Sequence, residues 1–477
     1  MKFNTTKTIK TTNKSGHVAY SMDDKTKLVT QVLTSFFNER KFYGDNTDDM
    51  VKTIERVVAN DPEFIAKLAV FARREFNMRS VAHVLVSYLA HDPSGKPFAR
   101  RAMRSIALRG DDLTETVAFY LATFGKPLPH SLRNGISDKL QTMDEYQLAK
   151  YKGTGKSVTM KDLLCLCRPK PINDAQSELW RRVLNDELAV PVTWETQLSA
   201  NGNNAETWER LIDSGKVGYM ALLRNLRNII KADPSNIGKV YETIADPNRV
   251  RKSKQLPFRF LSAYKSIQEV GSSAAFSALE SAVDASVDNL PKLHGRTVIA
   301  IDVSGSMSQY VSSKSDVTCV EISTMLGLLA NRICDDAIVY KFNTSVKRGG
   351  YPWNVAVLAT ASTAQCGGGT DMYLPFKAML DNNVKADRVI VISDNECNSP
   401  WRSTRTVQSL ADKYRKQSGN DIWVHAIDLQ GYGTQQFHGR KTNIIAGWSE
   451  KVFEFILLAE QGEGALLDAI EAYDLQG

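Results

Sequence analysis

The hydrophobic period of the chain changes near residue 296, and this change limits the fold more than any other feature of the sequence. Before it, apolar residues recur every three or four positions, as in Phe64, Leu68 and Phe71, which is the spacing of a helix with one buried face. After it, short runs of apolar and β-branched residues alternate with helical patterns. The chain is therefore expected to contain an all-helical part followed by an α/β part.

The second part has the pattern of a parallel, doubly wound sheet. Strands are predicted over residues 297–301, 337–342, 388–393 and 422–427. Helices are predicted over residues 317–333, 371–380, 406–416, 450–459 and 465–473. Ligands of such sheets bind at the carboxyl ends of the strands, so residues at those ends are the first candidates for a site.

The first part is predicted to be helical from residue 22 to about residue 287. Short polar connections separate the helices, and Asp-Pro pairs such as Asp61-Pro62 supply a cap and a first helical residue. We interpret the pattern as stacked helix pairs of the HEAT type, which form a curved surface and can close into a ring. The alternative is an irregular helical bundle, because the sequence has no fixed repeat length.

Composition and period divide the chain into three segments. Residues 1–15 contain four lysines and no acidic residue, which is typical of a mobile basic arm. Residues 16–290 form the predicted helical domain, and residues 291–477 form the predicted α/β domain. Residues 285–296, which have mixed charge, are predicted to be the linker between them.

Charge is distributed unevenly along the chain. The net charge is +7, but the part from Thr297 onward has 16 Lys and Arg against 20 Asp and Glu, which leaves +11 for residues 1–296. A polyanion is therefore expected to bind the first part. No apolar run is long enough to cross a bilayer, and the six cysteines have neither the spacing of a zinc site nor that of a disulfide framework. These features predict a cytoplasmic protein with reduced thiols and no membrane partner.

A candidate metal site lies where the first predicted strand ends. Asp302, Ser304 and Ser306 follow that strand at alternate positions, Thr370 follows three glycines in a later loop, and Asp394 follows another strand. Their oxygens can converge at one sheet edge, and oxygen ligands suit Mg²⁺ or another hard divalent cation. The hydroxyls would bind directly and the aspartates mainly through water, which leaves one position for a carboxylate from a partner protein. Taken alone, Asp, Ser and Gly after a strand are also ordinary turn residues.

The part of the chain from about Thr297 resembles a von Willebrand factor A (vWA) domain, because these five residues match its metal-ion-dependent adhesion site in order and in loop placement. Nearly all of the chain beyond the basic arm resembles the Ro ribonucleoprotein family, whose helical portion is called the TROVE domain. The stretches that carry this likeness are MKDLLCLCRPKP (160–171), GYMALLRNLRNII (218–230), GGTDMYLP (368–375) and SDNE (393–396).

This resemblance implies a helical ring that binds RNA. In the family, single-stranded 3′ ends of misfolded non-coding RNA enter the hole of the ring, and a small Y-type RNA binds the basic outer surface. The resemblance places Arg168 and Lys170 in a loop near the RNA site, and it matches Arg133 less closely to a neighbouring helix. No DNA partner is expected.

Other basic residues are candidates for RNA contact on the basis of position alone. Arg224 and Arg227 share one helix face, which is either a phosphate-binding surface or an ordinary solvated face. Lys139, Lys156 and Lys161 add positive charge near the loop that contains Arg168.

Catalysis has little support in the sequence. The glycines around Lys156 suggest a P-loop, but Lys150 stands where that motif requires glycine. None of the seven histidines has a recognisable ligand spacing or a nucleophile partner. We therefore expect a non-enzymatic RNA-binding protein. The alternatives are a helical protein-interaction scaffold with a metal-dependent adhesion domain, and a Mg²⁺-dependent phosphatase with Asp302 as the nucleophile, although position 304 is Ser where such a phosphatase has a second acid.

Overall fold

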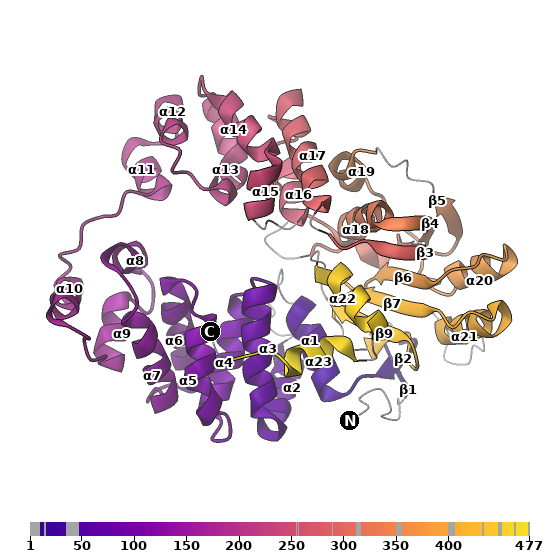
Figure 1. Ribbon diagram of the computed structural model, residues 1–477, viewed down its shortest axis with the longest axis horizontal. Coiled ribbons are helices and arrows are strands. Elements are labelled where there is room, and N and C mark those ends of the chain that lie inside the picture. Colours follow the sequence, from indigo (N-terminus) through magenta and orange to yellow (C-terminus); the bar gives the residue numbers. More distant parts are fainter. Residues whose placement is uncertain are drawn as a thin grey trace. The chain divides into compact units, whose positions relative to one another are not determined.

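The computed structural model describes residues 10–13, 16–34, 47–253, 255, 257–288, 290–311, 316–349, 355–398, 406–431, 434–446, 451–461 and 464–475. The chain divides into two compact units, which are described separately (Figure 1). The helical unit contains residues 24–196 together with 467–477, and the sheet unit contains residues 1–23 together with 197–466. These units differ from the predicted domains, because neither of them ends near residue 290.

The helical unit is built from helices that pack on their near neighbours in sequence. They are α1 (Asp24–Thr34), α2 (Thr47–Asn60), α3 (Pro62–Glu75), α4 (Ser80–His91), α5 (Lys96–Ile106), α6 (Gly110–Phe124), α7 (His130–Leu140), α8 (Glu145–Lys150), α9 (Met160–Cys167) and α10 (Asp174–Leu184). Helix α3 packs on α4 and α5, α4 packs on α6, and α5 packs on α7. This order of contacts is typical of stacked helix pairs. The predicted helical character of this part is confirmed.

Helix α3 shows how local sequence sets a boundary and a buried face. The Asp61 carboxylate accepts a hydrogen bond from the Phe64 backbone N–H at 3.0 Å, and Pro62 is the first helical residue, as predicted. Phe64 and Leu68 are almost completely buried, so the predicted apolar stripe faces the core of the unit.

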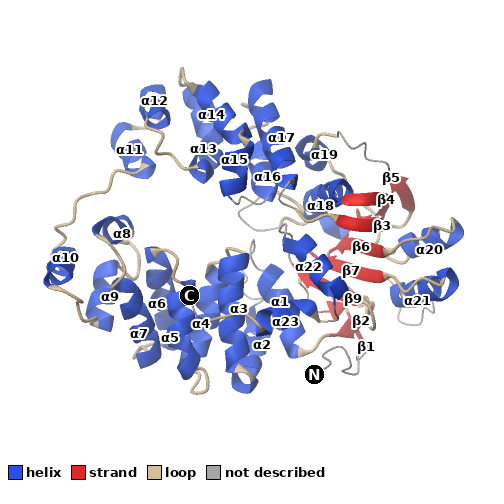
Figure 2. Ribbon diagram, viewed as in Figure 1, coloured by secondary structure: helices blue, strands red, loops and turns tan. Residues whose placement is uncertain are grey.

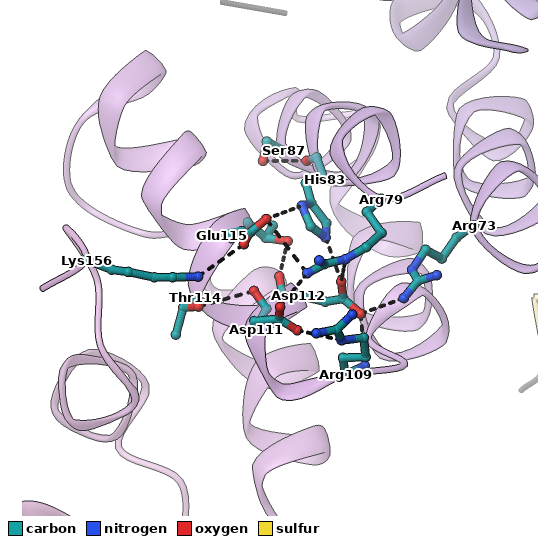
Figure 3. A network of polar contacts seen from close by, with 11 residues as sticks. Arg73, Arg79, His83, Ser87, Arg109, Asp111, Asp112, Thr114, Glu115 and Lys156 are labelled. Atoms are coloured by element: carbon teal, nitrogen blue, oxygen red, sulfur yellow. Dashed lines mark hydrogen bonds and ion pairs between the residues drawn. The ribbon is translucent and has the colours of Figure 1, made fainter. Parts of the chain in front are cut away.

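A buried carboxylate joins three helices of this unit (Figure 3). Asp112 of α6 is completely buried and accepts hydrogen bonds from Arg73 of α3 at 2.9 Å and from Arg79, just before α4, at 2.9 Å. The His83 imidazole lies 3.2 Å from the same carboxylate, and the Arg109 backbone N–H donates to it at 2.9 Å. Burial alone would raise the pKa of Asp112, but the hydrogen bond to His83 and the positive charges of Arg73 and Arg79 hold it well below its usual range.

The end of the chain packs against helices α1, α3 and α5. Helix α23 (Ala465–Glu471) carries Glu471, whose carboxylate pairs with Lys25 at 2.7 Å. The Tyr473 hydroxyl donates to the Glu75 carboxylate at 2.8 Å, and the Ser105 hydroxyl donates to the Leu475 carbonyl at 3.1 Å. These contacts assign the last described residues to the helical unit.

The sheet unit begins with further helices. They are α11 (Trp194–Asn201), which spans the division between the units, α12 (Ala205–Asp213), α13 (Tyr219–Ala232), α14 (Ile237–Ala245), α15 (Pro247–Ser253), α16 (Pro257–Ser266) and α17 (Ser273–Val287). Helix α13 packs on α14 and α16, and α14 packs on α17. Between α1 and α17 the described residues form no strand, as the sequence predicts.

The sheet itself has six strands in the order β5-β4-β3-β6-β7-β9 (Figure 2). The strands are β3 (Leu293–Asp302), β4 (Cys334–Phe342), β5 (Val346–Gly349), β6 (Arg388–Ser393), β7 (Trp423–Asp428) and β9 (Thr442–Ala446). Only the β4–β5 pair is antiparallel. The predicted parallel sheet is confirmed, and β6 has the predicted bounds.

Helices cover both faces of this sheet. These helices are α18 (Cys319–Ile333), α20 (Leu374–Asp381), α21 (Val407–Ser418) and α22 (Lys451–Gln461). Helix α19 (Val357–Ser362) packs on α16, α17 and α18. Helices α20 and α21 share one apolar core with Val298 and Val391 of the sheet. On the other face α18 lies so close to β3 that a Cβ on Gly327 would come within 2.3 Å of the Ile301 side chain. The alternation of strand and helix therefore produces the doubly wound arrangement that was predicted.

One prediction about the segments beside the domains is wrong, and another needs narrower bounds. The part of the basic arm that the structure describes forms strand β1 (Lys10–Thr12), which pairs with β2 (Val18–Ser21), and β2 pairs with β8 (Thr434–Gln435). Residues 1–9, 14 and 15 of the arm lie outside the described residues. The predicted linker is shorter than its predicted bounds, because α17 continues to Val287 and β3 begins at Leu293. Backbone pairing with β2 overrides the local composition of the arm.

In the described residues, no helix is both long enough and apolar enough to cross a membrane.

The Asp112 cluster predicts an unequal pair of stability effects. Replacing Asp112→Asn removes the charge that compensates the buried Arg73, so the helical unit should lose about 3–5 kcal/mol of unfolding free energy. Asp138→Asn breaks the ion pair with Arg100, whose side chain is 55% exposed, and should cost less than about 1 kcal/mol. Urea denaturation, with hydrogen exchange followed in α4 and α6, measures both. Equal effects of the two substitutions would contradict this account.

Candidate metal centre and nucleic-acid interface

The two aspartates of the predicted metal site lie at the carboxyl ends of neighbouring strands. Asp302 is the last residue of β3, and Asp394 directly follows β6. The two strands are parallel and in register, with Ile301 opposite Ile392. Both carboxylates are completely buried. The sheet therefore brings these two residues to the same edge, as the sequence predicts.

Hydrogen bonds fix the Asp302 carboxylate on both oxygens. Its Oδ1 accepts from the Ser304 backbone N–H at 2.8 Å, and its Oδ2 accepts from the Ser393 hydroxyl at 2.6 Å. The hydroxyls of Ser304 and Ser306 lie 3.1 Å apart at the start of the short 3₁₀ helix η4 (Gly305–Ser308). The predicted Asp-x-Ser-x-Ser spacing thus directs one carboxylate and two hydroxyls into a single small region.

The glycine-rich loop is tied to this first loop by backbone hydrogen bonds. The Gly305 N–H donates to the Gly368 carbonyl at 2.9 Å, and the Gly367 N–H donates to the Val303 carbonyl at 2.8 Å. Gly368 has φ +78°, a conformation that favours glycine. Thr370 follows and is 4% exposed, and its carbonyl accepts from the Asn398 N–H at 2.8 Å. All three predicted loops are therefore held together.

The electrostatics of the two aspartates favour a bound cation. Burial and the negative charge of Asp394 raise the pKa of Asp302 above its ordinary value. Burial also raises the pKa of Asp394, and the nearby Ser306 hydroxyl opposes that rise. Among the described residues, Asp394 Oδ2 is buried and has no hydrogen-bond partner. A divalent cation would compensate both charges and would give this oxygen an interaction directly or through water.

The donor set fits a hard cation better than a soft one. The five predicted residues supply only hydroxyl and carboxylate oxygens, which suit Mg²⁺. In the part of the chain that the structure describes, no group of three or more His, Cys, Asp or Glu side chains is placed to hold a metal ion. Any metal at this edge would therefore depend on Ser304, Ser306 and Thr370 as well as on the two aspartates.

Sequence reasoning missed residues that support this edge. Ser393 was within reach of prediction, because it stands directly before Asp394 at the end of a predicted strand. Asn395 has φ +64°, is 3% exposed, and its side chain donates to the Thr434 carbonyl at 3.1 Å. Asn13 of the N-terminal segment donates to the Cys397 carbonyl at 3.1 Å, a contact between residues 384 positions apart that has no local signal.

The predicted RNA-binding residues of the helical unit lie on α7, on α9 and in the loops beside α9. Arg168 ends α9 in the left-handed conformation, with φ +49°, and is exposed together with Lys170. The Lys170 carbonyl accepts from Gln141, which directly follows α7, at 2.8 Å. The positive charge of Arg133 on α7 acts on the Cys167 thiol, whose pKa burial raises to about 12. Arg133, Arg168 and Lys170 are thus gathered where α7 and α9 meet.

The remaining lysines of this set differ in their surroundings. Lys139 is half-buried near the end of α7, and Lys161 is exposed on the first turn of α9. Lys156 pairs with Glu115 at 3.3 Å, at the edge of the Asp112 cluster (Figure 3). This pairing makes Lys156 the weakest candidate for phosphate contact, because an RNA phosphate would compete with a carboxylate.

Arg224 and Arg227 belong to the sheet unit, in helix α13, and not to the helical unit. Both are exposed, while Leu222, Leu223 and Leu226 on the opposite side of the helix are buried. Arg227 lies 3.4 Å from Glu269, an exposed pair that contributes little to stability. The predicted basic face is therefore present, because α13 has exposed arginines on one side and buried leucines on the other.

Sequence reasoning also missed a basic stretch on α5. Lys96, Arg100, Arg101 and Arg104 are exposed along this helix, whose sequence is KPFARRAMRSI. The signal was present in the spacing of these residues, which places several of them on one side of a helix.

Comparison with known protein families identifies both parts of the chain. A model of the TROVE domain matches residues 11–187 and 185–289, and a model of the Ro60 vWA domain matches residues 296–435. The chain also shares its fold with the crystal structure of the Deinococcus radiodurans RO (RSR) protein, with a TM-score of 0.65 and 18% identity. That likeness covers 91% of this chain and 100% of the other.

Curated relatives match over about half of the chain. Telomerase protein component 1 of Rattus norvegicus is 28% identical in an alignment of 295 positions that covers 44% of this chain and 11% of that protein. The RNA-binding protein RO60 of Caenorhabditis elegans is 26% identical in an alignment of 254 positions that covers 48% of this chain and 38% of that protein. The matched region is thus a minor part of each relative.

The bond between Ser393 and Asp302 predicts a local loss of stability. Ser393→Ala leaves a buried carboxylate oxygen without its donor, so the sheet unit should lose about 1–3 kcal/mol of unfolding free energy in buffer without divalent cations. Ser308→Ala removes an exposed hydroxyl at the end of η4, in the segment that follows Asp302, and should change stability by less than about 0.5 kcal/mol. Urea denaturation in EDTA compares the two variants. A Ser393→Ala protein as stable as Ser308→Ala would show that Asp302 does not depend on this bond.

Proposed function

The chain belongs to the Ro ribonucleoprotein family, in which a TROVE domain precedes a vWA domain, and on that premise we propose that it binds non-coding RNA. The observation that carries the proposal is the succession of the two matching domain models along residues 11–435. The name of one relative, the RNA-binding protein RO60 of Caenorhabditis elegans, supports the same class of ligand. The charge of +11 on residues 1–296 is of the sign that RNA requires.

The RNA ligands proposed are single-stranded 3′ ends of misfolded non-coding RNA and a small RNA of the Y type. Arg168 and Lys170 are the first candidates for phosphate contact, because both are exposed and Arg168 is held by the end of α9. Arg133, Lys139 and Lys161 would extend this surface along α7 and α9. Arg224 and Arg227 would form a second surface on α13, and Lys156 would contribute only after leaving Glu115.

The vWA domain is proposed to bind Mg²⁺ and, through it, a protein partner. Ser304, Ser306 and Thr370 would coordinate the ion directly, and Asp302 and Asp394 would act mainly through bound water. With so few charged ligands the ion would stay electrophilic and would accept a carboxylate from the partner. The domain would therefore serve for docking in a cytoplasmic, non-enzymatic protein.

Two alternatives make different predictions from the same residues. A helical protein-interaction scaffold would recover proteins but no RNA when it is isolated from cells. A Mg²⁺-dependent phosphatase would release phosphate from a panel of phosphate esters. The surroundings of Asp302 argue against phosphatase activity, because both carboxylate oxygens already accept hydrogen bonds and position 304 supplies a hydroxyl in place of an acid.

RNA binding should depend on salt and on the loop after α9. Changing Arg168→Glu and Lys170→Glu together should weaken binding of a single-stranded RNA by about tenfold or more and should reduce the salt slope by about two. The control carries the same charge change on α21, where Lys413 and Lys416 are exposed. Filter binding or fluorescence anisotropy at several salt concentrations measures both. An RNA affinity that changes neither with salt concentration nor with either double substitution would refute the proposal.

Mg²⁺ binding should depend on the two buried aspartates. Asp302→Asn or Asp394→Asn should abolish saturable binding of one Mg²⁺, because each removes half of the negative charge at the site. Asp381→Asn, at an exposed position of the same domain, should leave binding intact. Isothermal titration calorimetry compares the three variants after EDTA treatment and dialysis. Unaltered binding in both site variants would exclude this metal centre.

A further inference from the structure

A groove of about 360 Å³ lies in the sheet unit, between the edge strand β5 and helix α20. Strand β5 ends the six-stranded sheet, and among the described residues it pairs only with β4 (Figure 1). In such a strand every second residue directs its backbone N–H and C=O away from the neighbouring strand, where a further strand can pair with them. None of the residues that line the groove belongs to the sites proposed above for RNA or for metal.

The strand side of the groove follows from the alternation of side chains along β5. Val346 and Arg348 line the groove, whereas Lys347 between them points to the other face of the sheet. Tyr340 of β4 lies directly opposite Arg348 in the pairing register and is 3% exposed, so it forms the floor. A strand added along β5 would alternate in the same way and would place every second side chain over this floor.

The helix side of the groove comes from one face of α20. Leu374 and Ala378 are four residues apart and supply apolar surface, and Lys377 and Asp381 have the same spacing and supply charge. Lys377 and Asp381 form an ion pair with each other. Their charges therefore compensate one another, and α20 contributes no net charge to the groove.

Arg348 is the uncompensated charge of the groove. It is exposed, and among the described residues its guanidinium forms no ion pair and no hydrogen bond. Burial raises the pKa of the Tyr340 phenol, and the positive charge of Arg348 opposes that rise, which shows that the two groups lie near each other. The Tyr340 hydroxyl also forms no hydrogen bond within the described part of the chain. A carboxylate is an acceptor that both donors can share.

The charge of the edge indicates what can pair with it. Lys347 and Arg348 are adjacent in a strand of four residues. Pairing of β5 with β5 of a second copy would bring these like charges together across the new pair, which is unfavourable. A segment with Asp or Glu directly across from Arg348 would instead place a carboxylate in the groove, and small or apolar residues two positions away would contact Val346 and Ala378.

The hairpin that contains β5 is held in place by the glycine-rich loop and by the start of the segment that leads to α20. The Asn343 side chain, between β4 and β5, donates to the Gly367 carbonyl at 2.9 Å. The Asn343 carbonyl accepts from the Asp371 N–H at 2.9 Å. A preformed edge reduces the conformational entropy that is lost when a partner binds.

We propose that the groove between β5 and α20 binds an extended acidic segment of a partner protein, which pairs with β5 as a further strand and directs a carboxylate to Arg348 and Tyr340. Main-chain hydrogen bonds to β5 supply affinity, and the groove selects Asp or Glu with apolar residues at alternate positions. The surface is separate from the proposed metal centre, because their residues do not overlap. It requires neither RNA nor Mg²⁺, so failure of the proposed function is distinguishable from failure of this site.

The test is selection of short random peptides by phage display on the full chain in EDTA, followed by fluorescence anisotropy with the synthetic peptides. The selected peptides should contain Asp or Glu two positions from an apolar residue. Arg348→Glu should weaken their binding by about tenfold or more. Lys347→Glu makes the same charge change on the adjacent exposed residue, outside the groove, and should weaken binding by less than about threefold.

Methylation of the peptide backbone separates strand addition from contacts of side chains alone. Methyl groups on alternate peptide nitrogens should abolish binding when those nitrogens face β5 and should leave it when they face away. Circular dichroism checks that both variants are folded, and Arg348→Ala replaces Arg348→Glu if the latter is not.

Four results would overturn the proposal. They are a library that yields no peptide dependent on Arg348, equal effects of the Arg348 and Lys347 substitutions, equal effects of the two methylation patterns, and self-association of the chain that Arg348→Glu abolishes in sedimentation velocity. The last result would assign the edge to a second copy of the chain.

Discussion

The structure at the carboxyl edge of the sheet depends on two neighbouring buried carboxylates, those of Asp302 and Asp394. Burying like charges is costly unless hydrogen bonds or a cation compensate them. The chain supplies the bonds to Asp302 from Ser304 and Ser393, at 2.8 and 2.6 Å, but leaves Asp394 Oδ2 without a partner among the described residues. The loops are fixed by these bonds and by their own backbone contacts, so the oxygens are positioned before any ion arrives. Such preorganisation favours a cation that needs a defined geometry.

This edge could be predicted because it follows from a rule of topology. Strands that alternate with helices are parallel, and parallel strands end at the same edge, so Asp302 and Asp394 had to meet once their strands were recognised. The bounds of β6, Arg388–Ser393, were also predicted correctly, because a continuous apolar run has few other places in a doubly wound sheet. The hydrogen bond from Asn13 to the Cys397 carbonyl could not be predicted. It requires β2 to pair with β8, which lies more than 400 residues later in the sequence.

The candidate RNA-binding residues show what sequence reasoning could not predict. Helical spacing indicated that Arg224 and Arg227 share an exposed face, and they do, but it contained no information on which compact unit would hold that face. The division is decided by long-range packing, as when Tyr473 and Glu471 return to α3 and α1. Spacing also could not reveal that Lys156 pairs with Glu115, because the partner lies on α6, 41 residues earlier.

The stacking of the helical unit determines where its helices begin. Helices α3, α5 and α7 pack in succession. Ser94, just before α5, donates to the Val58 carbonyl in the last turn of α2 at 3.2 Å, so α3 and α5 begin at the same end of the stack. A stack of this kind collects helix N-termini along one edge. The first turns of these helices differ in their capping. The Asp61 side chain caps the first turn of α3, whereas α5 and α7 begin without a side-chain cap. The Asp112 cluster joins the helices at the opposite end of the stack, because Arg73 lies in the last turn of α3 and Asp112 lies in the first turn of α6.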